Sequence, residues 1–113
     1  MAQRLDEVMR KDHLYLNPKI TLFDVALAIG TNKTYLSDYF NSHLSTTFYD
    51  FLNTFRVEDA CALIKAMWHD GRRTMAEVAA ESGFNSLSTF NRYFKQITGM
   101  SPKQYYRQCR PQR

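Results

Sequence analysis

Residues 86–98, with the sequence SLSTFNRYFKQIT, bring together side chains that can hydrogen-bond to nucleic-acid bases. Helical spacing would turn Phe90 and Phe94 toward a core and the polar side chains away from it. The side chains left facing outward are Leu87, Ser88, Thr89, Asn91, Arg92 and Lys95. An arginine can grip a guanine edge, short polar groups suit base edges, and a leucine can touch a thymine methyl. The stretch predicts a helix that reads a DNA major groove; the alternative is a solvated face without a partner.

Residues 33–42, with the sequence KTYLSDYFNS, offer a similar but unequal set of outward side chains. This set is Thr34, Tyr35, Ser37, Asp38 and Asn41. Phosphate repels a carboxylate, so we expect Asp38 to accept a hydrogen bond from a cytosine amino group, to orient a neighbour such as Lys33, or to mark a weakly bound lobe. The two faces therefore differ in charge, and the one that carries Arg92 and Lys95 is the predicted anchor.

The candidate contact residues fall into two groups according to the part of DNA that they suit. The base-contact candidates are Thr34, Ser37, Asp38, Leu87, Ser88, Thr89, Asn91 and Arg92. The phosphate-contact candidates are Lys33, Asn41, Arg72, Arg73, Ser86, Lys95, Arg107 and Arg110. Phosphate contacts fix the position of a protein on a duplex, whereas base contacts give the specificity. Four of these residues, taken one at a time, are better explained as ordinary surface charges: Arg72, Arg73, Arg107 and Arg110.

Short helices separated by well-placed glycine and proline residues are expected to position these side chains, and no alternation of Val, Ile and Thr is typical of a strand. The predicted fold is all-α with about seven helices. The expected helices cover residues 2–14, 21–29, 33–42, 47–67, 74–82, 86–98 and a last one opened by Ser101 and Pro102. Predicted N-caps are Thr21, Asn32, Thr74 and Ser86, and residues 69–73 (HDGRR) form the predicted polar connector. In the long helix, the positions expected to face inward are Phe48, Phe51, Leu52, Phe55, Ala62, Leu63 and Ala66.

The chain repeats one pattern after a shift of 53 residues. The residues that coincide are Thr21 with Thr74, Val25 with Val78, Ala26 with Ala79, Gly30 with Gly83, and Asn32 with Asn85. In each copy, a small residue four positions before a turn glycine allows two helices to cross closely, which is typical of a helix-turn-helix. A plain helical hairpin is the alternative for a single copy, and a solenoid would need about three or more repeats.

The predicted long helix would join the two copies, which we call lobe one (about 2–46) and lobe two (about 74–110). At about 1.5 Å per residue, residues 47–67 span about 30 Å. Successive major grooves on one face of a duplex lie about 34 Å apart, so the two outward-facing helices could enter neighbouring grooves.

Composition restricts the function classes. With 113 residues, 44% hydrophobic and 23% charged, the chain can form a packed core, which argues against global disorder. Residues 1–71 carry seven basic and nine acidic side chains, whereas residues 72–113 carry eight and two, so the second half suits a polyanion. No apolar run suits a membrane span or a signal peptide, and we expect a cytoplasmic protein.

The sequence predicts no catalytic residue, no metal site and no cofactor. Cys61 and Cys109 are isolated and are expected to be reduced thiols, and His13, His43 and His69 lie at no catalytic or metal-ligand spacing. No glycine-rich phosphate loop is present. An enzyme is therefore the weakest of the functional interpretations.

The segment VAAESGFNSLSTFNRYFKQITGMSPKQYYR (78–107) resembles the signature of the AraC/XylS-type transcription regulators. The segments YLNPKITLFDVALAIGTNKTYLSDYF (15–40) and FLNTFRVEDACALI (51–64) resemble the rest of that family's DNA-binding domain. The resemblance implies two helix-turn-helix lobes joined by a long helix, with recognition helices at 33–42 and 86–98. The sequence departs from the family pattern at Asp38, often basic in the family, and at Leu87, often polar.

The resemblance also implies partners. Double-stranded DNA is the expected one, with RNA polymerase as a further candidate and no membrane contact by this segment. Family members usually carry a separate effector-binding or oligomerising domain, so we expect a fragment of a longer regulator, which could itself be membrane-anchored, rather than a short stand-alone member. The alternative function is a helical protein-interaction module that would use the tyrosines Tyr35, Tyr39, Tyr49, Tyr105 and Tyr106.

Overall fold

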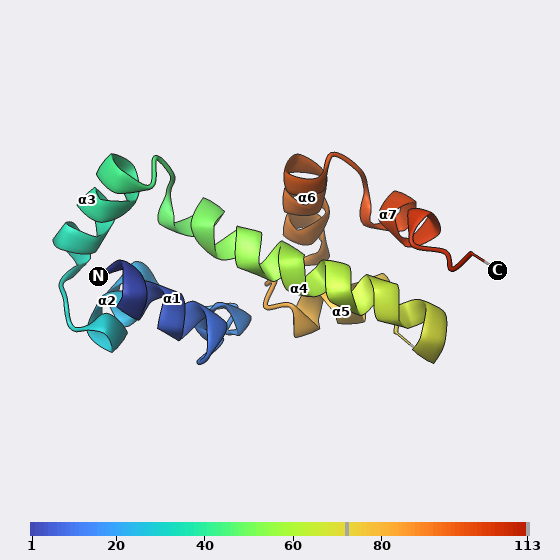
Figure 1. Cartoon of the computed structure of the whole chain (residues 1–113), viewed down its shortest axis with the longest axis horizontal. Coiled ribbons are helices and arrows are strands. Elements are labelled where there is room, and N and C mark those ends of the chain that lie inside the picture. The colour runs from blue at the N-terminus through green and yellow to red at the C-terminus, as the bar shows by residue number, and fades with distance from the viewer. Residues whose placement is uncertain (72, 113) are drawn as a thin grey trace.

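A computed structural model describes residues 1–71 and 73–112 of the chain (Figure 1). Within these residues the fold is all-α, with seven α-helices, one short 3-10 turn and no strand. The elements are α1 (Ala2–Arg10), η1 (Leu14–Leu16), α2 (Leu22–Ile29), α3 (Lys33–His43), α4 (Phe48–Asp70), α5 (Met75–Glu81), α6 (Leu87–Thr98) and α7 (Pro102–Gln108). The predicted fold class is therefore confirmed.

The long helix α4 runs through the middle of an elongated molecule with principal extents of 49, 26 and 23 Å. Helices α1 to α3 gather at one end of α4, and helices α5 to α7 gather at the other (Figure 1). Of the two helices that carry the predicted base readers, α3 lies beyond the N-terminal end of α4, and α6 lies against the middle of α4 (Figure 1). The two candidate reading elements are thus placed at different points along one long helix.

Most helix starts follow from local capping signals in the sequence. The hydroxyl oxygen of Thr21 accepts from the amide of Asp24 at 3.1 Å, and the Asp24 carboxylate accepts from the amide of Thr21 at 3.0 Å. Asn32, Thr74 and Ser86 cap α3, α5 and α6 by accepting from one backbone amide each, without a reciprocal bond. The predicted N-caps are confirmed.

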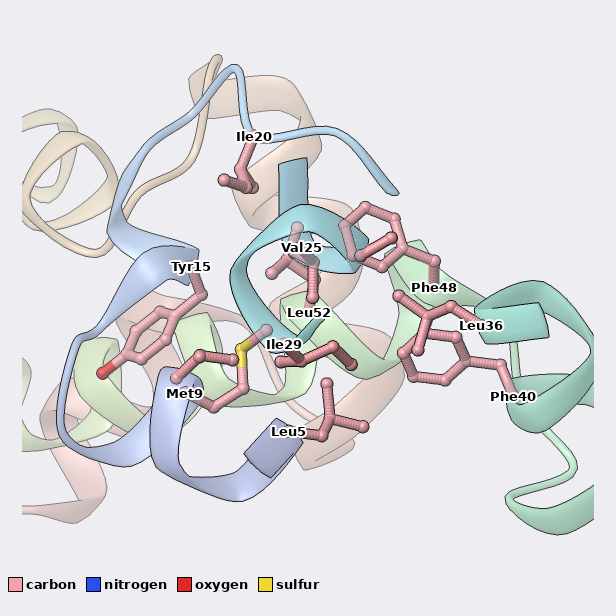
Figure 2. Close-up of a cluster of buried hydrophobic side chains, with 12 residues drawn as sticks. Leu5, Met9, Tyr15, Ile20, Val25, Ile29, Leu36, Phe40, Phe48 and Leu52 are labelled. Atoms are coloured by element: carbon pink, nitrogen blue, oxygen red, sulfur yellow. The ribbon is translucent and has the colours of Figure 1, made fainter. Parts of the chain in front are cut away.

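Lobe one has its own core, which Figure 2 shows in close-up. Leu5 and Met9 of α1 pack against Val25 and Ile29 of α2, and Leu36 and Phe40 complete the cluster from α3. Lobe two has a second core, built around fully buried Val78, Phe90 and Phe94. Both recognition helices are anchored by side chains of 0 or 1% exposure, so their inner faces are fixed.

The first helix is shorter than the expected range 2–14, because it ends at Arg10. His13 then adopts a left-handed conformation with φ 52°, and residues 14–16 form the turn η1. This break buries Tyr15, whose hydroxyl donates to the Asp59 carboxylate on α4. Burial and this hydrogen bond raise the pKa of the Tyr15 phenol. A contact with a distant helix therefore overrides the helical pattern at residues 11–14.

The long helix also differs from its expected range, because it continues to Asp70 and Gly71 caps it with φ 69°. His69 and Asp70 thus belong to α4 and not to a connector. Ala62 is exposed, and the buried positions of the second half are Val57, Ala60 and Ile64. The physical reason is a change of face. Successive residues of a helix are rotated by about 100°. Phe48 and Leu52 therefore point to one side of α4, where they join the core of lobe one. Val57 and Ile64 point to nearly the opposite side, where they join the core of lobe two.

Candidate nucleic-acid interface

Helix α3 is presented by the turn that precedes it. Gly30 ends α2 in the left-handed region with φ 81°, where glycine is free of the Cβ penalty. Asn32 then starts α3 by accepting from the amide of Tyr35 at 2.8 Å. Thr34, Asp38, Asn41 and Lys33 are exposed on its outer face, whereas Ser37 is half-buried. The predicted residues of lobe one are therefore brought together on one helix face.

Helix α6 is presented in the same way. The Ser86 hydroxyl accepts from the amide of Thr89 at 3.1 Å and donates to the Thr89 hydroxyl at 2.9 Å. Among the predicted contact residues of α6, the exposed side chains are Leu87, Ser88, Asn91, Arg92 and Lys95. Thr89 is half-buried, and the guanidinium carbon of Arg92 lies 5.3 Å from the centre of the Tyr93 ring. The polar groups of Ser86 and Thr89 are thus partly engaged within the protein.

The outer surface of α6 divides between two hollows. Asn91 and Lys95 line a hollow of about 450 Å³ beside Pro102 at the start of α7. Thr89 and Arg92 line a different cleft, which faces lobe one. The contact candidates of α6 therefore point in two directions, Asn91 and Lys95 toward one hollow and Thr89 and Arg92 toward the other.

The phosphate-contact candidates outside the recognition helices have unequal surroundings. Arg107 and Arg110 are exposed. Arg73 instead forms an ion pair with Glu81 at 2.7 Å and a longer one with Asp70 at 3.6 Å. The hydrogen bond from Arg73 holds the pKa of the Glu81 carboxyl below its ordinary value. The charge of Arg73 is therefore already compensated, and Arg72 lies outside the described residues.

The side chain of Arg56, in the middle of α4, joins the two lobes. It is 6% exposed. Its Nε donates to the carbonyl of Tyr15 at 2.7 Å, one terminal nitrogen donates to the carbonyl of Asn17 at 3.0 Å, and the other donates to the Asn53 side chain at 2.9 Å. The guanidinium also lies 6.0 Å from the centre of the Phe84 ring in lobe two. One side chain thus contacts the η1 segment, α4 and the turn before α6.

Gly83, the turn glycine of lobe two, brings the backbones of the two lobes into contact. It has φ 95°, and a Cβ at this position would lie 2.4 Å from the Tyr15 carbonyl oxygen and 2.9 Å from Cα of Leu16. The same Cβ would lie 3.1 Å from Nε of Arg56. Only a residue without a side chain fits this approach. The helix-turn-helix of lobe two is therefore seated directly on lobe one.

Sequence reasoning missed this junction and the cleft beside it. The cleft has a volume of about 300 Å³, and its walls include Tyr49, Asn53, Arg56 and Asn85. The only sequence signal is the presence of two polar residues, Asn53 and Arg56, near the middle of the stretch FLNTFRVEDACALI. The structure shows that both are buried. A buried polar pair in the middle of a helix indicates a partner elsewhere in the chain.

The tyrosines proposed for a protein-interaction surface do not form one exposed set. Tyr35 and Tyr49 are 60% and 57% exposed. Tyr39, Tyr105 and Tyr106 are half-buried, and the Tyr106 ring stacks on Trp68 at 4.4 Å. In the described part of the chain, no cluster of His, Cys, Asp and Glu could hold a metal, and no helix is both long and apolar enough to cross a membrane.

Known sequences place the chain in a family. A family model described as a helix-turn-helix domain matches residues 25–108. An uncharacterised HTH-type transcriptional regulator of Staphylococcus aureus (strain COL) is 30% identical over 102 residues, which are 90% of this chain and 13% of that protein. An uncharacterised response regulatory protein of Staphylococcus epidermidis is 24% identical over 106 residues, which are 94% of this chain and 40% of that protein. The chain thus spans a minor part of the length of these relatives.

Solved structures share the fold. The C-terminal domain of the two-component response regulator yesN from Fusobacterium nucleatum superposes with a TM-score of 0.77 at 24% identity, covering 93% of this chain and 96% of that one. The DNA-binding domain of AdpA, solved in complex with a target DNA, gives a TM-score of 0.76 at 24% identity, covering 95% and 93%. The family match over residues 25–108 shows that the chain belongs to the AraC-type helix-turn-helix family.

Proposed function

We propose that this domain binds an asymmetric double-stranded site, with α3 and α6 in two successive major grooves. The observation that carries the proposal is the buried junction at Arg56 and Gly83, which fixes the lobe that holds α3 against the lobe that holds α6. Two unlike recognition faces in one chain require two unlike half-sites, so a palindrome is unnecessary.

The two lobes are expected to contribute unequally to affinity. In α6, Arg92 and Lys95 supply positive charge, while the aligned positions of α3 hold Asp38 and Asn41. Phosphate attracts the first set and repels Asp38. Lobe two is therefore the proposed anchor, and lobe one adds specificity through Thr34, Ser37 and Asp38.

The proposal extends to the setting in which the domain acts. The partner is chromosomal or plasmid DNA in the cytoplasm, with RNA polymerase as a further partner. Because the chain covers only 13% of one relative and 40% of another, we infer that a sensing or oligomerising domain regulates this activity in longer proteins of the family.

Selection of bound duplexes from a random pool tests the proposal. We expect enriched sequences with two different half-sites about one helical turn apart. A palindromic site, or no enrichment, would contradict it. If the domain binds other proteins but no duplex DNA, the alternative function, a helical protein-interaction module, is favoured.

Replacing Arg92 with alanine is expected to weaken binding to the selected site by about 1 to 3 kcal/mol, because a bidentate arginine contact to a base or phosphate is lost. Fluorescence anisotropy would measure this as a roughly 5- to 150-fold rise in Kd. Lys65→Ala is the matched control, since it removes one exposed positive charge from α4. Equal affinities of the wild type and the Arg92 variant would remove Arg92 from the interface.

Affinity for random duplex DNA is expected to fall steeply with salt. Each neutralised phosphate contributes about −0.9 to the slope of log K against log salt concentration, and roughly five basic contacts predict a slope of about −4.5. The exposed basic candidates are Lys33, Arg92, Lys95, Arg107 and Arg110. The double change Arg107→Gln and Arg110→Gln should make the slope shallower by about 2. A flat response would contradict a phosphate interface.

A further inference from the structure

The cleft between the two lobes lies where a duplex would pass from one recognition helix to the other. Tyr49 and Asn53 line it from α4, Asn85 from the turn before α6, and Thr89 and Arg92 from α6 itself. Its volume is about 300 Å³, and its lining includes the base-contact candidates Thr89 and Arg92 of α6. The cleft is therefore part of the same surface as the proposed DNA interface.

The charges around this cleft are positive without compensation. Two guanidinium groups, those of Arg56 and Arg92, line the cleft, and no aspartate or glutamate does. Among the described residues, no carboxylate lies within salt-bridge distance of either arginine. Arg56 is buried with neutral acceptors only, although buried charges in proteins are usually paired. Burial accordingly lowers the pKa of Arg56.

Hydrogen-bond donors remain available in the cleft. Arg56 has five N–H groups, and its bonds to Tyr15, Asn17 and Asn53 use three of them. Tyr49 is 57% exposed and carries a hydroxyl, and Asn85 is exposed and carries an amide. A tetrahedral anion with several acceptor oxygens suits such a set of donors.

We propose that the inter-lobe cleft binds one phosphate of the DNA backbone, in the segment between the two half-sites. The proposal rests on the proposed function, since that function brings the duplex across the cleft. The phosphate supplies the negative charge that Arg56 lacks within the protein, and it ties the DNA to the side chain that joins the lobes. Tyr49, Arg56 and Asn85 are thereby added to the residues that contact DNA.

A scan of the selected duplex with single methylphosphonate substitutions tests this site. Each substitution removes the charge of one phosphate. For the wild type, we expect one or two adjacent positions between the half-sites at which affinity falls about tenfold. A scan without such a position would overturn the proposal, while enrichment of an asymmetric site would leave the proposed function standing.

The variant Asn85→Asp links the sensitive position to the cleft, because it places a carboxylate in the wall. It should lower affinity for the unmodified duplex about tenfold, and the methylphosphonate penalty at the sensitive position should fall below about twofold, since the two losses are coupled. Gln3→Glu is the matched control, with the same change from amide to carboxylate at an exposed site on α1. It should keep the wild-type scan. An unchanged penalty in Asn85→Asp would overturn the proposal.

A competition experiment with inorganic phosphate distinguishes two occupants of the cleft, a phosphate of the DNA backbone and a free phosphate ion. If inorganic phosphate lowers the affinity for DNA more than chloride does at equal ionic strength, and the methylphosphonate scan shows no sensitive position, the cleft is a site for a free anion and the proposal is overturned. A sensitive backbone position with no special effect of inorganic phosphate supports the proposal. Thermal melting of each variant confirms that the compared proteins are folded.

Discussion

Replacing Gly83 with alanine is expected to lower the free energy of unfolding by about 3 kcal/mol or more. Two costs add: a side chain at φ 95° costs roughly 1 to 2 kcal/mol, and the new Cβ would lie 2.4 Å from the Tyr15 carbonyl oxygen. Because that atom belongs to the backbone, relief requires one lobe to move from the other. Thermal unfolding followed by circular dichroism should show a fall in Tm of about 10 °C or more.

Gly99→Ala provides the control for this prediction. Gly99 has φ 83°, similar to Gly83, but an added Cβ would meet nothing within 4 Å. The destabilisation of Gly99→Ala should be the conformational cost alone, roughly 1 to 2 kcal/mol. The difference between the two variants therefore measures the contact between the lobes. Equal losses would show that the lobes are not held in contact at Gly83.

Replacing Arg56 with methionine is the second change with a large expected effect. Methionine matches the arginine chain only as far as Nε and lacks donors, so the carbonyls of Tyr15 and Asn17 and the Asn53 side chain would lose their partners. Relief of the buried charge offsets part of this loss, and we expect a net destabilisation of about 3 kcal/mol in chemical denaturation. Arg10→Met, at an exposed arginine of α1, should cost less than about 1 kcal/mol.

The Arg56 variant should also change how strongly DNA affinity depends on the spacing between the two half-sites. Wild-type affinity should fall steeply when one base pair is inserted between the half-sites, because the lobes are fixed. Arg56→Met should bind the original and the lengthened sites with more similar affinities, measured below its melting temperature. The same dependence on spacing in both proteins would show that Arg56 stabilises the fold without setting the distance between the recognition helices.

Local signals were sufficient to predict most of the helices. Capping by Thr21, Asn32 and Ser86 depends on residues within one turn, so it can be recognised without the fold. The inward positions Phe90 and Phe94 followed from helical spacing for the same reason. The repeat of these signals placed the two helix-turn-helix lobes correctly.

Features that depend on distant residues could not be predicted in this way. The end of α1 at Arg10 reflects the burial of Tyr15 against α4 and its bond to Asp59, 44 residues away. The ion pair of Arg73 with Glu81 forms across a turn and a helix, so the sequence alone left Arg73 as a free candidate. The inter-lobe cleft likewise exists only after lobe one, α4 and lobe two have packed together.

The two cores meet α4 at points that are close in sequence. Leu52 belongs to the first core and Val57 to the second. Inserting a single residue between them would advance lobe two by only about 1.5 Å but would rotate it by about 100° around the helix axis. Such an insertion would leave helix propensity and hydrophobic composition almost unchanged, yet it would turn α3 and α6 toward different sides of a duplex. The number of residues in this short interval therefore sets the angle between the two lobes around the axis of α4.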